Sequence, residues 1–96
     1  MKPWFLYLIE CVDGSIYTGI TTDVAARYAA HLRGVGARYT RSRPPVRLLA
    51  VESHADRASA SRAEYQVKQL SPRAKRAYAA RLMSQDGETA SGVIAK

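Results

Sequence analysis

Five side chains of this sequence belong to types that move protons, hold anions or ligate metals, and they occur in an ordered series. They are Tyr7, Tyr17, Arg27, His31 and Glu64. Tyrosine and histidine exchange protons, a guanidinium binds phosphate oxygens in a planar fork, and a carboxylate can hold a divalent cation. The set is therefore suited to acid–base chemistry beside an anion.

Each of these residues, taken singly, also has an ordinary structural explanation. Aromatic residues on strands usually serve packing, which would account for both tyrosines. Arg27 and His31 are four positions apart, so they share one face of a helix and would be unremarkable at a solvated edge. Glu64 lies at the border of an apolar helix face, where a carboxylate needs a partner, either an arginine or a metal. No single residue of the set decides a function.

The elements that must position these residues can be predicted from the apolar pattern. It predicts an α+β domain, a small antiparallel three-stranded sheet flanked by helices, in the order β-β-α-β-α-α. Strands are expected over 4–12, 15–20 and 47–52, and a basic loop over 34–45. Helices are expected to begin after Thr22 or Asp23, after Asp56 and after Ser71. We expect a single domain over 1–83, followed by a polar, flexible C-terminal segment over 84–96.

The turn between the first two strands decides whether the two tyrosines can share a site. A two-residue loop, Asp13-Gly14, would place Tyr7 and Tyr17 on opposite faces of the sheet. A three-residue loop, 12–14, with Gly14 in the left-handed region, places both tyrosines on one face. We predict the second arrangement, with Tyr7 opposite Gly19 and open space beside it for a phosphate.

This register also predicts what lies on each face. Leu6, Leu8, Ile16 and Ile20 would form a core on the face opposite to the tyrosines. Arg27 and Glu64 are expected on the tyrosine face.

Charge and composition narrow the class of partner. Fifteen Lys and Arg residues against eight Asp and Glu give a net charge of +7 and a pI of about 10.0. A basic surface favours nucleic acid or an anionic membrane surface, and a merely soluble basic protein is the plain alternative. The longest apolar run is too short to cross a membrane. Cys11 is the only cysteine, which excludes an internal disulfide and a cysteine zinc site, so we expect a cytoplasmic protein.

The ordered set resembles a known family over residues 3–83. The segment 15–21, then Arg27 and His31, then the segment 36–45, then Glu64 closely resembles the GIY-YIG nuclease superfamily. Within it, the chain looks like the small stand-alone bacterial proteins of the YhbQ and YazA type. It is also similar to the catalytic domain of structure-selective eukaryotic junction resolvases.

The resemblance assigns roles to single positions. Tyr7 matches the tyrosine of the first signature, of which it is the only remaining residue, and Tyr17 with Gly19 matches the second. Arg27 matches the family's helix arginine and His31 a histidine found in some branches. Glu64 matches the metal-binding glutamate. A late asparagine of the family has no counterpart, because the chain contains no asparagine.

The resemblance implies hydrolysis of phosphodiester bonds in DNA with Mg²⁺ or Mn²⁺, structure-selective or in repair and recombination, with RNA left open as a substrate. Glu64 would ligate the metal and Arg27 would clamp the scissile phosphate. Tyr7 or Tyr17 would take the proton of the attacking water, with His31 as a further candidate, and we favour Tyr7. The oligomeric state stays open, a monomer included.

Further residues are expected to bind nucleic acid or to shape the hairpin. The expected nucleic-acid contacts are Arg33, Arg38, Tyr39, Arg41, Arg43 and Lys68, and the structural glycines are Gly14 and Gly19. Two alternatives to the enzyme are a catalytically weak nucleic-acid-binding accessory module on the same fold, and a protein-interaction or structural role. The complete set of two tyrosines, arginine and glutamate favours the enzyme, because a binding module has no need of Glu64.

Overall fold

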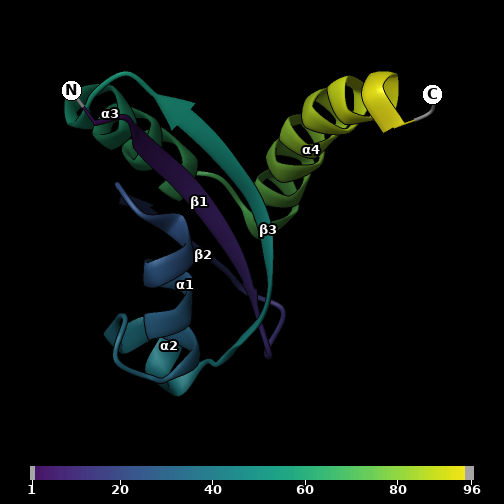
Figure 1. The fold of residues 1–96 in the computed structure, drawn as a ribbon. Coiled ribbons are helices and arrows are strands. Elements are labelled where there is room, and N and C mark those ends of the chain that lie inside the picture. Colours follow the sequence, from purple (N-terminus) through teal and green to yellow (C-terminus); the bar gives the residue numbers. More distant parts are fainter. Residues whose placement is uncertain (1, 95–96) are drawn as a thin grey trace.

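The computed structural model describes residues 2–94, with side chains as far as Ser84. In chain order its elements are β1 (Trp4–Cys11), β2 (Ile16–Thr21), α1 (Val24–Leu32), α2 (Arg38–Ser42), β3 (Pro45–His54), α3 (Arg57–Lys68) and α4 (Pro72–Ile94). The strands form one antiparallel sheet in the order β2-β1-β3 (Figure 1). The predicted fold class is confirmed.

The hairpin has the predicted odd register. Tyr7 pairs with Gly19 and Ile9 with Tyr17, and Gly14 has a φ of 85°. The last residue of a three-residue loop of this kind has a positive φ, which glycine adopts without strain. Both tyrosines therefore point to one face of the sheet.

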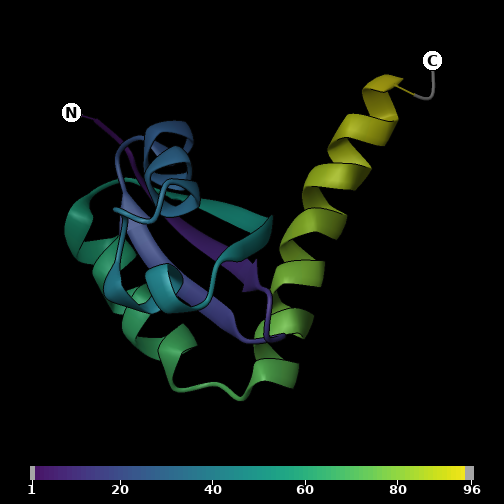
Figure 2. The same ribbon diagram turned by 90° about the horizontal axis from the view of Figure 1, so that it is seen from below.

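The two faces of the sheet are covered by different helices (Figure 2). On one face Leu6 and Leu8 pack with Ala63 and Val67 of α3 and with residues of α4. On the other, which we call the tyrosine face, Tyr7 and Ile9 pack with residues of α1 and α2, among them Tyr28 and Tyr39. The core predicted from the register is confirmed.

Apart from one-residue shifts at the ends of β1 and β2, the structure differs from the sequence prediction in three places. The expected basic loop contains the short helix α2, whose Thr40 is buried. Strand β3 extends beyond 47–52 in both directions because it pairs along the whole of β1. Helix α4 continues past Ser84 as far as Ile94, and the flexibility expected of 84–96 stays a prediction.

Within residues 2–94, no helix combines the length and apolar character needed to cross a bilayer.

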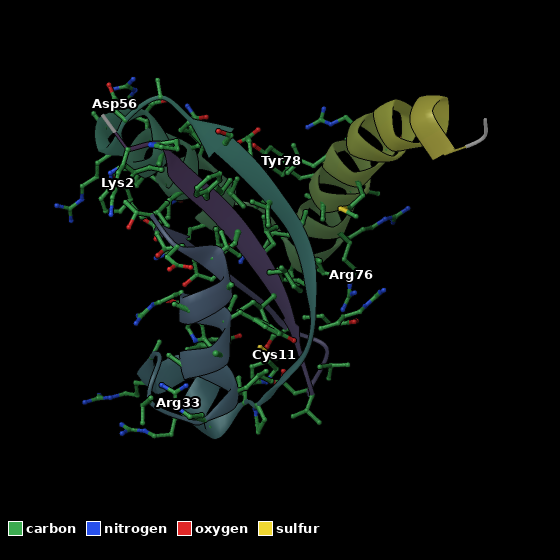
Figure 3. The ribbon with its side chains drawn as sticks, in the orientation of Figure 1. Lys2, Cys11, Arg33, Asp56, Arg76 and Tyr78 are labelled. Carbon is green, nitrogen blue, oxygen red and sulfur yellow. The ribbon has the colours of Figure 1, made fainter. Side chains whose placement is uncertain are left out.

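Side-chain hydrogen bonds tie α4 to the sheet at two places (Figure 3). Near the hairpin, Arg76 Nη1 donates to Glu10 Oε2 at 2.8 Å and its Nη2 donates to Gly14 O at 2.7 Å. Farther along α4, the Tyr78 hydroxyl donates to Glu52 at 2.8 Å, and Glu52 in turn lies 2.8 Å from His54 Nε2. These contacts hold α4 beside β3 while the other face is left to α1 and α2.

The conformation of Gly14 generates a first prediction. Gly14→Ala should lower the free energy of unfolding by about 1–2 kcal/mol, because a Cβ is strained at positive φ. No neighbour lies within 4 Å of the added Cβ, so the cost comes from the backbone alone. Gly14→Asn should cost less, since asparagine tolerates this region. Urea denaturation of the two variants measures the difference, and equal costs would contradict the backbone explanation.

Candidate active site

A chain of three hydrogen-bonding side chains lies at the centre of the tyrosine face. The Tyr7 hydroxyl oxygen is 2.9 Å from His31 Nε2, and His31 Nδ1 is 2.7 Å from Thr40 Oγ1. The three residues are at most 1% exposed. The chain joins β1, α1 and α2 in the interior of the protein.

The partners of this chain assign the position of each proton. The Thr40 hydroxyl donates to the carbonyl of Ala37 at 3.2 Å, so it accepts from His31 Nδ1–H. The other ring nitrogen, Nε2, then carries a lone pair and accepts the Tyr7 O–H. His31 is therefore a neutral acceptor aimed at Tyr7.

Electrostatics keep both partners uncharged near neutral pH. Burial, and in smaller part the charge of Arg27, lower the pKa of His31. Burial and the neighbouring Tyr17 raise the pKa of Tyr7 to about 12, although Arg27 acts in the opposite direction. The resting site holds a protonated tyrosine beside an unprotonated imidazole.

Local sequence explains how α1 presents Arg27 and His31. Asp23 caps the helix by accepting from Ala26 N at 3.0 Å, and the two residues follow on successive turns of it. Arg27 Nη2 donates to Gly36 O at 2.6 Å, which fastens α1 to the segment before α2. A Cβ on Gly36 would lie 2.5 Å from His31 Nδ1, so only glycine lets this segment approach the ring.

Gly19 has a similar role on β2, and it corrects one expectation. We expected Gly19 to leave open space beside Tyr7. Instead, a Cβ at this position would lie 2.6 Å from the Tyr7 hydroxyl oxygen, so the ring of Tyr7 itself occupies that space. Gly19 permits the close packing of Tyr7 rather than the direct approach of a phosphate.

Tyr17 is the more exposed of the two tyrosines. It is half-buried, and its ring centroid lies 5.0 Å from that of His31 and 5.8 Å from that of Tyr39. The guanidinium of Arg43 lies 4.5 Å from the Tyr39 ring centroid on a cation–π contact. A continuous row of rings thus leads from the buried His31 to an arginine at the surface.

Glu64 is not on the tyrosine face, which contradicts our expectation for its placement. Its helix, α3, turns Ala63 and Val67 to the face that carries Leu6 and Leu8. The stripe of apolar residues on α3, rather than the position of Glu64, decided which face the helix covers. Within the described residues, Glu64 pairs with Lys68, whose Nζ lies 3.2 Å from Oε2.

A cleft at the edge of the sheet nevertheless links the two faces. Strand β2 is an edge strand, and the cleft, of about 320 Å³, wraps around it. Its lining residues are Ile16, Tyr17, Thr18, Tyr39, Lys68 and Lys75. Tyr17 and Tyr39 come from the tyrosine face, and the lysines come from the helices of the other face. We call this cavity the β2-edge cleft.

The remaining residues expected to bind nucleic acid lie near the tyrosine face. Four exposed arginines lie in α2 or directly after α1 and α2: Arg33, Arg38, Arg41 and Arg43. Arg43 Nε also donates a hydrogen bond to Asp13 Oδ2 at 3.1 Å.

Sequence reasoning did not identify Thr40 and Lys75 as parts of the site. Thr40 reaches His31 only because α2 folds back against α1, and Lys75 reaches the β2-edge cleft only because α4 starts beneath β2. A threonine inside a basic segment and a lysine on a helix carry no signal of such contacts.

The oxygen donors present suit a hard cation that keeps its water ligands. Over the described residues, no group of three or more His, Cys, Asp or Glu side chains is placed to hold a metal. Mg²⁺ is usually bound through one or two carboxylates together with water and substrate phosphates. Glu64, with its side chain 22% exposed, fits that kind of site once Lys68 moves aside.

Comparison with known proteins gives consistent matches. Residues 3–78 match the GIY-YIG catalytic domain. The chain is 59% identical over 76 residues to UPF0213 protein XAC3202 of Xanthomonas axonopodis pv. citri, covering 79% of this chain and 74% of that protein. It is 51% identical over 75 residues to UPF0213 protein YhbQ of Escherichia coli, covering 78% and 75%.

Two solved structures are also similar. One is the UPF0213 protein BH0048 of Bacillus halodurans, at 46% identity and a TM-score of 0.52, covering 81% of this chain and 83% of that one. The other is the protein EF2693 of E. faecalis, at 36% identity and a TM-score of 0.57, with the same coverage.

The raised pKa of Tyr7 predicts a loss of stability in alkali. An unfolded tyrosine ionises near pH 10, whereas folded Tyr7 holds its proton to about pH 12. As the pH rises between these values, ionisation of the unfolded tyrosine lowers the free energy of unfolding, by up to about 2–3 kcal/mol at the upper end. Denaturation measured from pH 9 to 12 should show a smaller fall for Tyr7→Phe than for the parent protein. Tyr65→Phe, at an exposed position, is the control, and identical slopes in all three proteins would refute the assignment.

Proposed function

The chain belongs to the family of GIY-YIG catalytic domains, a nuclease-type family, and on that premise we propose that it is a metal-dependent endonuclease that hydrolyses phosphodiester bonds in DNA. The observation that supports this most is the buried chain from Tyr7 through His31 to Thr40. It provides a tyrosine hydroxyl with a neutral imidazole ready to receive its proton. A module that only binds nucleic acid has no use for such an arrangement.

The proton path follows from the hydrogen bonds. As the oxygen of water bonds to phosphorus and the bond to the leaving oxygen breaks, the water proton passes to the Tyr7 oxygen. The hydroxyl proton of Tyr7 passes at the same time to His31 Nε2. Thr40 holds the Nδ1–H in place, so the ring keeps its orientation throughout. The leaving oxygen takes its proton from solvent water. Burial disfavours the imidazolium, so His31 then returns its proton through Tyr7 to solvent, which restores the resting site.

Access to Tyr7 requires a movement of Tyr17. Tyr7 is 1% exposed, and the half-buried Tyr17 lies beside it with ring centroids 6.2 Å apart. We propose that the Tyr17 ring turns toward the bound strand and lets the attacking water reach the Tyr7 hydroxyl. Arg27 lies close enough to Tyr7 to act on its pKa, and its charge would stabilise the negative charge that develops on the phosphate.

Glu64 would hold Mg²⁺ or Mn²⁺. When bound, such a cation polarises the phosphate and neutralises developing charge. The ion pair between Glu64 and Lys68 has to open first, because the Lys68 ammonium occupies the place beside the carboxylate. The other ligands would be water and the substrate.

Two observations favour a second candidate, a catalytically weak nucleic-acid-binding accessory module. Tyr7 is closed off from solvent, and Glu64 is already paired with a lysine. If neither contact opens in the presence of substrate, the protein would bind DNA or RNA through its arginines without efficient cleavage.

A cleavage assay tests the proposal. Purified protein would be incubated with branched, single-stranded and duplex DNA, with Mg²⁺ or with chelator. Glu64→Gln and Tyr7→Phe should each lower the rate at least 100-fold, since general-base and metal contributions are of about this size. A preference for branched DNA would support a role in repair or recombination.

The matched control for Tyr7→Phe is Tyr65→Phe, which should cleave at the parental rate. Glu64→Gln should remain folded by circular dichroism, because Glu64 is partly exposed. Cleavage by Glu64→Gln at the parental rate would rule out its assignment as the metal ligand. Binding without cleavage by the parent protein would instead favour the accessory module.

The arginines after α1 generate a separate prediction about binding. Each phosphate contact on duplex DNA contributes about 0.9 to the slope of log affinity against log salt, or about 0.7 on single strands. Changing Arg38, Arg41 and Arg43 together to Ala should therefore weaken binding and flatten that slope by about 2–3. Fluorescence anisotropy at several salt concentrations measures both quantities, and an unchanged slope would place the phosphate contacts on another surface.

A further inference from the structure

The β2-edge cleft contains a second group of phosphate-binding donors that the proposed reaction does not use. We propose that Lys68, Lys75 and Thr18 form a subsite for a phosphate group of the nucleic-acid strand, separate from the phosphate that is cleaved. This inference rests on the proposed function, because the same strand occupies both places. It assigns a path to the substrate, over the open edge of β2.

The first support is the geometry of the two lysines. Lys68 ends α3 and Lys75 lies in the first turn of α4, and both line the cleft. Lys75 Nζ lies 3.5 Å from the carbonyl oxygen of Ile16, on the edge strand. Two lysines from different helices thus line the cleft at this strand edge, and the ammonium group of Lys75 reaches the strand itself.

The second support is the backbone of β2. Cys11 N donates to Ser15 O, and in an antiparallel pair the bonded positions alternate. Tyr17 and Gly19 are therefore bonded to β1, whereas the N–H of Thr18 points away from β1. No strand of the described sheet lies on that side of β2. The Thr18 N–H is directed to the strand edge that the cleft surrounds.

The third support is the side chain of Thr18. Thr18 is 2% exposed, and its Oγ1 is the one buried side-chain polar atom in the described part of the chain that has no hydrogen-bond partner. Burying a hydroxyl without a partner costs free energy, and a bound ligand or water is one explanation for such an atom. A phosphate oxygen in the cleft would accept from this hydroxyl.

The charges point to an anion rather than to water. Lys68 and Lys75 provide two positive charges, and Lys68 is paired with the carboxylate of Glu64. Burial, and in smaller part the like charge of Lys68, lower the pKa of Lys75. Like charges this close to one another repel. A phosphate between them would relieve this repulsion, and it would also free Glu64 from Lys68.

The neighbours of the subsite place it next to the reaction. Tyr17 and Tyr39 line the same cleft and belong to the row of rings that leads to His31. A strand bound here would pass from the arginines of α2, across the tyrosines, to the side of the sheet that carries Glu64. The opposite placement of Tyr7 and Glu64 is then bridged by the substrate itself.

Binding of fluorescein-labelled oligonucleotides in the presence of chelator tests the subsite. Lys75→Ala should weaken binding about tenfold and lower the salt slope by about 0.7–0.9. The matched control is Arg62→Ala, which removes one charge from an exposed position of α3 outside the cleft and should change affinity less than twofold. Equal affinities and slopes for the two variants would overturn the proposal.

Thr18→Val separates binding from folding. This variant should weaken binding about threefold without changing the salt slope, and it should raise the melting temperature, because it removes a buried hydroxyl that has no partner. A parental affinity would exclude Thr18 from the subsite. Weaker binding together with a lower melting temperature would mean that Thr18 acts through the fold.

Oligonucleotides with a 5′-phosphate or a 5′-hydroxyl identify the source of the phosphate. If Lys75→Ala weakens both equally, the subsite takes an internal backbone phosphate. If it weakens only the phosphorylated strand, the subsite takes a strand end. These measurements need no cleavage, so they test the subsite and the proposed reaction separately. Weaker binding by Lys75→Ala, in a protein without nuclease activity, would support the subsite and refute the proposed reaction. Nuclease activity of the parent protein, with unchanged binding by Lys75→Ala, would support the reaction and refute the subsite.

Discussion

The arrangement of the tyrosine face depends on one constraint: a completely buried imidazole ring needs hydrogen-bond partners for both of its nitrogens. Both nitrogens of His31 require partners, and in this protein they come from different elements, Tyr7 on β1 and Thr40 on α2. A buried polar chain of this kind tolerates little displacement, because a lost partner leaves a desolvated group behind. The short helix α2, which has no side-chain cap of its own, is held in place by this contact and by the contact of Arg27 with Gly36.

The same constraint explains two glycines that lie far apart in the sequence. Gly19 and Gly36 approach the Tyr7 hydroxyl and the His31 ring so closely that a methyl group at either position would collide with them. The hydrogen-bond chain is therefore enclosed by backbone on both sides. This enclosure keeps the imidazole neutral and leaves Tyr17 as the tyrosine that the surroundings can reach.

The second organising feature is that β2 lies at the edge of the sheet. The apolar stripe of α3 packs on the face opposite to the tyrosines, so Glu64, on the same helix, lies on that side of the sheet. In a central strand this would separate the Glu64 carboxylate from Tyr7 and His31 by the full thickness of the sheet. At an edge strand, side chains from both faces can line one cleft, and the β2-edge cleft contains residues of both.

The sequence by itself determined those features that depend on local chemistry. Gly14 at the end of a three-residue loop set the hairpin register, Asp23 and Asp56 capped their helices, and alternation placed Leu6 and Leu8 in the core. Only the tertiary structure decided which face α3 covers, the partnership of Thr40 with His31 and the approach of Lys75 to β2. These features depend on packing between segments that are distant in the chain. The orientation of a helix follows its largest apolar contact, and the positions of its polar residues follow from that orientation.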